Sequence, residues 1–119
     1  MNTRTSFRYL LFVSLLFAAA SCAENKPKVT LSPERILRSG VIEMKGTGFT
    51  PKATALSHLR RPDGTEFPVL PFLTDERGEF THDIDTLLLS PGTHEVWVED
   101  ENSKVVSEVV RFEVTTESP

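Results

Sequence analysis

Histidine and serine side chains are the first groups in this sequence to consider for metal binding or nucleophilic catalysis. His58, His82 and His94 fall in three separate segments, without the short spacings of a metal site. Ser57 and His58 are adjacent, so on a β-strand their side chains point to opposite faces and do not form a nucleophile–base pair. We therefore expect no metal site, no catalytic residue and no enzyme activity.

Glycines and acidic residues offer two further kinds of binding site. Gly46 and Gly48 lead into Phe49 and Pro51 instead of opening a helix, so they are not a phosphate-binding loop. The acidic side chains fall mainly in turns and lack the alternating order of calcium ligands; they are Asp63, Asp75, Glu76, Asp83, Asp85, Asp100 and Glu101. We expect a solvated acidic rim and no cofactor, and a calcium ion in these turns stays as the alternative.

Cys22 is the only cysteine, so an internal disulfide and a zinc finger are both excluded. It follows an N-terminal segment with Arg4 and Arg8 at its start, an apolar run over residues 9–20 and no acidic residue. The apolar run is shorter than the roughly 20 residues that span a bilayer, and its pattern is typical of a secretory signal peptide. We predict that residues 1–21 are cleaved.

The cleavage junction Ala19-Ala20-Ser21-Cys22 resembles the bacterial lipobox, although Ala19 stands where the family prefers leucine. The resemblance implies that Cys22 is acylated and becomes the first residue of a lipoprotein. Ala23 follows it in place of the aspartate that resembles an inner-membrane retention signal. In a Gram-negative source, we therefore expect anchoring in the outer membrane, facing the periplasm.

Charge and length limit the remaining chain. Residues 22–119 keep 11 of the 13 basic side chains and all 17 acidic ones, a net charge of −6. An acidic domain is repelled by nucleic acid and by anionic lipid, so we expect no nucleic-acid partner and membrane attachment through the lipid alone. We divide this part into a lipidated tether over residues 22–28, one domain over 29–114 and a disordered tail over 115–119.

Short alternating runs separated by proline and glycine make the domain all-β. We expect about seven strands, with the prolines of residues 67–73 placing that run at a sheet edge or a sheet crossing. The expected strands span residues 29–31, 41–45, 53–60, 67–73, 79–85, 94–99 and 105–114. This spacing favours a single antiparallel β-sandwich.

Four turn motifs in order resemble those of bacterial immunoglobulin-like domains of the IPT/TIG or fibronectin III-like early-set kind. They are Gly46-Thr47-Gly48-Phe49, Pro62-Asp63-Gly64-Thr65, Thr74-Asp75 with Gly78-Glu79-Phe80, and Leu89-Ser90-Pro91-Gly92-Thr93. The resemblance covers residues 29–114 and implies an immunoglobulin-like sandwich. Related domains carry tyrosine at a structural corner where His94 stands here. Either the imidazole replaces the phenol as hydrogen-bond donor, or the corner bond is lost.

Trp97 is the only tryptophan and is out of phase with Val96 and Val98, so it should lie on the outer face of its sheet. A hairpin to the last strand places it opposite either Val109 or Arg111, depending on the register. Trp97, Val109 and Arg111 are our candidate partner-binding residues, because exposed tryptophan is enriched at binding hot spots. The alternative interpretation is a ring that merely covers its sheet.

These features favour a lipid-anchored, non-catalytic interaction or assembly module of the cell envelope, with a protein partner. The alternative is a domain that binds a glycan or another small ligand through one face. Turn motifs of this kind predict the fold and do not identify the partner.

Overall fold

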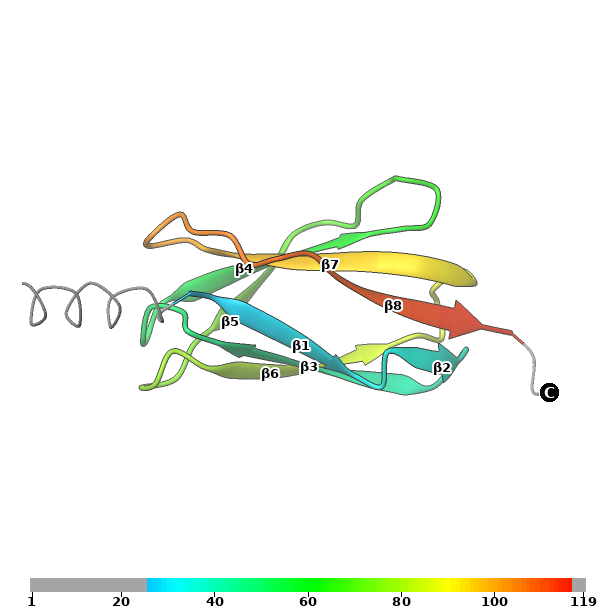
Figure 1. Ribbon diagram of the computed structural model, residues 1–119, viewed down its shortest axis with the longest axis horizontal. Coiled ribbons are helices and arrows are strands. Elements are labelled where there is room, and N and C mark those ends of the chain that lie inside the picture. The colour runs from blue at the N-terminus through cyan, green and yellow to red at the C-terminus, as the bar shows by residue number, and fades with distance from the viewer. Residues whose placement is uncertain (1–25, 117–119) are drawn as a thin grey trace, which may run out of the picture.

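The computed structural model describes residues 26–116, which form eight β-strands in two stacked sheets (Figure 1). The strands are β1 (Lys28–Ser32), β2 (Arg35–Leu37), β3 (Val41–Thr47), β4 (Thr54–Arg60), β5 (Leu70–Leu73), β6 (Phe80–Asp85), β7 (Gly92–Asp100) and β8 (Val110–Thr115). The predicted all-β sandwich is confirmed. Within this range, no helix is long and apolar enough to cross a bilayer. The expected signal peptide, Cys22 and residues 117–119 of the expected tail lie outside the described residues.

The smaller sheet has the order β1-β3-β6, and the larger one the order β2-β8-β7-β4-β5. Every pair is antiparallel except β2 with β8, which is parallel and corrects the expectation of a purely antiparallel sandwich. The exception arises because the chain leaves β1 at Pro33, crosses to the other sheet and continues beside β8. The three residues of β2 were not predicted, since they are too few to show an alternating pattern.

Two other strands are shorter than expected. β5 begins at Leu70 instead of Phe67, and it lies at the edge of the larger sheet, where Pro71 is tolerated. β8 begins at Val110 instead of Val105, because Ser107 interrupts the pairing with β7. The Val98 N–H donates to the Ser107 hydroxyl at 2.9 Å, in place of a backbone carbonyl. The first strand, β1, begins at Lys28, which was assigned to the tether. The last strand, β8, ends at Thr115, which was assigned to the tail.

The core lies between the sheets and follows the predicted alternation. Ile42 and Met44 of β3 are at most 1 % exposed, and so are Val96 and Val98 of β7. Burial of such side chains contributes roughly 1.5–3 kcal/mol each. The central strands of both sheets are therefore fixed by hydrophobic burial.

Two of the glycine motifs interlock at one end of the sandwich. A side chain at Gly46 would collide with the ring of Phe80, and one at Gly78 would collide with the backbone of Phe49. Gly78 also has a φ of +74°, which other residues rarely adopt. The rings of Phe49 and Phe80 then meet edge to face at 5.4 Å. The motifs noticed in the sequence thus hold β3 and β6 together.

Candidate functional site

Trp97 lies on the outer face of the larger sheet, opposite His58 of the neighbouring strand β4. The imidazole stacks on the indole, with 5.2 Å between the ring centroids and 6° between the planes. The guanidinium of Arg60, two residues further along β4, lies 4.8 Å from the centroid of the indole ring. A ring held by a stacked neighbour and a cation has little freedom to change rotamer, so Trp97 is presented in a fixed orientation.

A row of charges borders the indole. Glu95 lies two residues from Trp97 along β7. Its carboxylate accepts a hydrogen bond from the Arg60 guanidinium at 3.1 Å and forms an ion pair with Arg111 of β8 at 2.9 Å. The Glu95 side chain is 24 % exposed, whereas that of Arg111 is 61 % exposed. One carboxylate therefore joins β4, β7 and β8 across the face, and Arg111 keeps part of its guanidinium free.

Aliphatic side chains occupy the other side of the indole. The register pairs Val96 with Val110, so its next step places Val109 opposite Trp97. Val109 is 43 % exposed, and Val106 on the same face is 52 % exposed. We call Trp97, His58, Val106, Val109 and Arg111 the Trp97 patch.

The structure thus places the three candidate residues on one face, in the register that puts Val109 and not Arg111 opposite Trp97. Trp97, Glu95 and Glu99 are all half-buried, while Val96 is 1 % exposed. The contacts of His58 and Arg60 with Trp97 were not predicted from the sequence. These contacts depend on the pairing of β4 with β7, whose paired residues are 35 to 45 positions apart in the sequence and are not joined by a hairpin.

His94 lies in the core and belongs to neither face. It is fully buried and stacks on Phe112, with 5.1 Å between the centroids. Its Nδ1 is 3.3 Å from the carbonyl oxygen of Gly92, and its Nε2 has no hydrogen-bond partner among residues 26–116. Burial lowers the pKa of the His94 imidazole, and the positive charge of Arg61 lowers it further. The hydrogen bond to the Gly92 carbonyl raises the pKa but does not offset burial. His94 is therefore neutral at physiological pH and packs as part of the core.

Other groups considered for chemistry lie apart from one another. Ser57 points into the core and His58 out of it, as expected for neighbours on a strand. Across residues 26–116, no three His, Cys, Asp or Glu side chains are grouped so as to hold a metal ion. Asp100 is 3 % exposed, so its assignment to a solvated rim was wrong. It lies at the end of β7, where loop residues cover it.

Comparison with known proteins identifies the fold. No family model and no curated protein matches the sequence. Among solved structures, macromomycin is 10 % identical with a TM-score of 0.54, over 75 % of this chain and 99 % of that one. CHIR-AB1 is 17 % identical with a TM-score of 0.49, over 76 % and 98 %. The CARDB domain of the PF1109 protein from Pyrococcus furiosus is 10 % identical with a TM-score of 0.45, over 76 % and 86 %.

The two-sheet topology and the similarity to macromomycin define the class of this domain. It is an immunoglobulin-like β-sandwich, a fold that carries interaction and assembly modules among many other functions.

Proposed function

We propose that this chain is a lipid-anchored, non-catalytic module of the bacterial cell envelope that binds a protein partner through the Trp97 patch. The observation that carries the proposal is the fixed indole of Trp97 next to exposed aliphatic side chains and a row of ion-paired charges. Tryptophan and arginine are the residues most enriched at binding hot spots. Because His58 and Arg60 already restrain the indole, a partner would lose little further side-chain entropy on binding.

The contrast between the two halves of the patch suggests how the partner is recognised. Val106 and Val109 offer apolar area that water contacts in the isolated domain. Arg111, with its half-free guanidinium, offers a donor for a carboxylate at the border. A complementary surface would carry an apolar centre and an acidic or carbonyl-rich rim.

Lipidation at Cys22 would hold this surface close to the membrane. Lys28, at the start of β1, is the sixth residue after Cys22, and six extended residues reach at most about 20 Å. The net charge of −6 opposes adsorption to anionic lipid, so attachment would depend on the acyl chains. In a Gram-negative source, we place the domain at the outer membrane, facing the periplasm.

The glycan alternative is less well supported by the arrangement of rings. Sugar sites commonly present aromatic faces to the ligand, but the ring beside Trp97 is His58, which stacks on the indole itself. Arg60 lies over the same ring system. The indole face is thus occupied in large part by the protein's own side chains.

Site-specific photocrosslinking in intact cells tests the patch. A photoreactive amino acid at Val109 should give a defined adduct with one envelope protein, and one at the exposed Thr30 of the other sheet is the matched control. Trp97→Ala should abolish the Val109 adduct at an unchanged melting temperature. A lower melting temperature with the adduct intact would mean that Trp97 only covers its sheet.

Lipidation is tested separately with Cys22→Ser. The variant should accumulate as an uncleaved or soluble form, detected by membrane fractionation and intact-mass measurement. Unchanged fractionation and mass would refute the anchor without affecting the proposal for the Trp97 patch.

A further inference from the structure

Among the strands that the structure describes, β6 is an unpaired edge of the smaller sheet, and its backbone geometry is fixed by its pairing with β3. The Thr86 N–H donates to the Gly40 carbonyl in the same register, so residues 84, 82 and 80 also exchange hydrogen bonds with β3. The alternate residues Thr81, Asp83 and Asp85 therefore direct their N–H and C=O groups away from the sheet. They present a free row of donors and acceptors.

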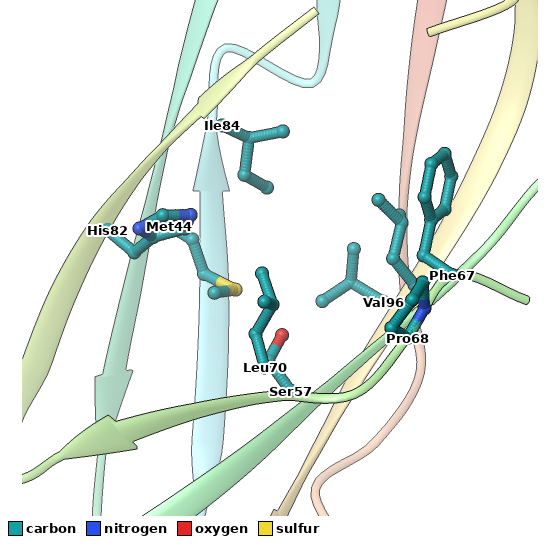
Figure 2. Close-up of a pocket in the computed structure, with 9 residues that line it drawn as sticks. Met44, Ser57, Phe67, Pro68, Leu70, His82, Ile84 and Val96 are labelled. Atoms are coloured by element: carbon teal, nitrogen blue, oxygen red, sulfur yellow. The ribbon is translucent and has the colours of Figure 1, made fainter.

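An apolar cavity of about 190 Å³ opens between this edge and the larger sheet (Figure 2). Its walls include Met44 and Ile84 from the smaller sheet and Leu70 and Val96 from the larger one, with Ser57 and His82 as polar members. An apolar cavity of roughly 150 Å³ is enough to take up benzene. This space can therefore hold one branched or aromatic side chain.

Exposure of the wall residues shows that the core is closed on β3 and open on β6. Met44 of β3 is 1 % exposed, whereas Ile84 of β6 is only half-buried. On the opposite wall, Leu70 is 50 % exposed. Phe72 closes one end of the space between the two sheets. Its ring stacks on Phe80, and its centroid lies 4.5 Å from the centroid of the His82 ring. Beyond this aromatic group, no strand within residues 26–116 pairs with the outer edge of β6.

The outer face of the same edge is acidic: it carries Glu43, Asp83 and Asp85 against one basic side chain, Lys45, which lies opposite Thr81. Glu43 of β3 lies directly opposite Asp83 of β6, in a pair whose side chains are close because it is not hydrogen-bonded. Neither these two nor Asp85 forms an ion pair within the residues that the structure describes. Like charges in such a pair are destabilising. A second β6 strand would add more carboxylates, so the edge disfavours self-association and favours a basic strand.

We propose that an extended segment of a partner protein adds to β6 as an antiparallel strand, with an apolar side chain in the cavity. Its alternate side chains would be basic and would face Glu43 and Asp83. Backbone hydrogen bonds to Thr81, Asp83 and Asp85 would supply affinity, and the cavity and charges would supply specificity. This site lies on the other sheet from the Trp97 patch and does not depend on it, so the domain would join two partners.

A blocked nine-residue peptide of alternating lysine and valine is the probe. It is added to the full chain in phosphatidylcholine nanodiscs, and hydrogen exchange is read at single amides. At ten times its dissociation constant, the peptide should slow exchange of the Thr81, Asp83 and Asp85 amides about tenfold. The indole N–H of Trp97 should be unaffected. Unchanged exchange at all three edge amides overturns the proposal.

Backbone methylation of the peptide tests strand addition itself. In antiparallel pairing, the N–H groups that reach β6 belong to residues whose side chains share the outer face with Asp83, here the lysines. Methylating the lysine amides should abolish the protection, and methylating the valine amides should leave it intact. Equal behaviour of the two methylated peptides overturns the proposal.

Variants of the protein and the peptide test the cavity and the charge. Ser57→Leu fills the cavity from within and should weaken binding about tenfold, and replacing the peptide valines with alanine should do the same without altering the protein. Asp83→Asn should weaken binding about threefold, whereas Glu101→Gln in an exposed turn should not change it. Binding that is indifferent to Ser57→Leu and to the alanine peptide overturns the cavity's role. Uptake of free indole without any peptide binding assigns the cavity to small molecules and overturns strand addition.

Discussion

Strand β7 carries a buried polar side chain near each end, Asp100 at one end and His94 at the other, and the two differ in their partners. Asp100 is 3 % exposed, yet its carboxylate accepts from the N–H and the hydroxyl of Thr50, both at 2.7 Å. It also accepts from the N–H groups of Asn102 at 3.1 Å and Ser103 at 3.4 Å. One side chain thereby fixes the turn after β7 and a loop fifty residues away.

His94 is as deeply buried and has far less support. Its only hydrogen-bond contact is the 3.3 Å approach of Nδ1 to the Gly92 carbonyl, and its Nε2 has no partner in the part of the chain that the structure covers. The ring is held mainly by its stack on Phe112. It therefore acts more as a flat core side chain than as a polar anchor.

The pKa values of the two side chains reflect this difference. Both are lower than usual, but for His94 the main cause is burial, which disfavours the imidazolium ion. For Asp100, burial alone would raise the pKa, and the hydrogen bonds from Thr50, Ser103 and Asn102 together outweigh it. A buried polar group thus stabilises the fold where its partners are complete, and carries a desolvation cost where they are not.

The largest effect is expected from Asp100→Ala. It removes four acceptor contacts and leaves the Thr50 N–H and hydroxyl without their partner, so the free energy of unfolding should fall by about 3 kcal/mol. Urea unfolding followed by circular dichroism measures the change. Asp63→Ala, in an exposed turn, is the control and should lower the free energy of unfolding far less. Equal losses in the two variants would contradict the importance of burial.

The pH dependence gives a second measure of Asp100. Because its folded pKa is below the ordinary 3.8, the folded state binds fewer protons than the unfolded chain in acid. The stabilisation is complete above about pH 5 and is lost as the pH falls below 3.8 and through the folded pKa. This acid-sensitive part should be smaller in Asp100→Ala than in the natural chain.

A smaller loss is expected from His94→Ala, which removes the stack on Phe112 and leaves a cavity in the core. The free energy of unfolding should fall by about 2 kcal/mol, measured by the same urea titration. A melting temperature that does not move would show that neither the corner contact nor the stack contributes to stability. The comparison with Asp100 would then have to be drawn on burial alone.

How far the sequence determined these features depends on the range of each interaction. The alternation around Val96 and Val98 is local, so the outward direction of Trp97 could be predicted from it. The stack of His58 on Trp97 needs the β4–β7 register, which no local pattern fixes. The sequence allowed two registers for the last hairpin, with Trp97 opposite either Val109 or Arg111, because the chain around Ser107 departs from regular strand pairing.

The buried polar residues show the same limit. Asp100 was placed in a solvated rim because it begins the polar run of residues 100–104, and only the approach of Thr50 in space reveals its burial. His94 was recognised because it stands in phase with Val96 and in a place where related domains have tyrosine. The sequence could not show that Nε2 is left without a partner, since that depends on how the surrounding side chains pack.

The smallest change in stability is expected from His94→Phe, and its effect lies in the pH dependence. Phenylalanine keeps a flat ring against Phe112 and removes the unpartnered Nε2, so the free energy of unfolding at pH 7 should change by less than about 0.5 kcal/mol. In the natural chain, the folded pKa of His94 is below the ordinary 6.5, so the unfolded state binds more protons below that pH. Stability should therefore decline as the pH falls from about 7.5 to about 5.5, and this contribution should be missing from His94→Phe. Urea titrations of both proteins at the two pH values measure the difference, with His58→Phe on the outer face as the matched control. An identical decline in the natural chain and in His94→Phe would mean that the buried imidazole is not the group that titrates.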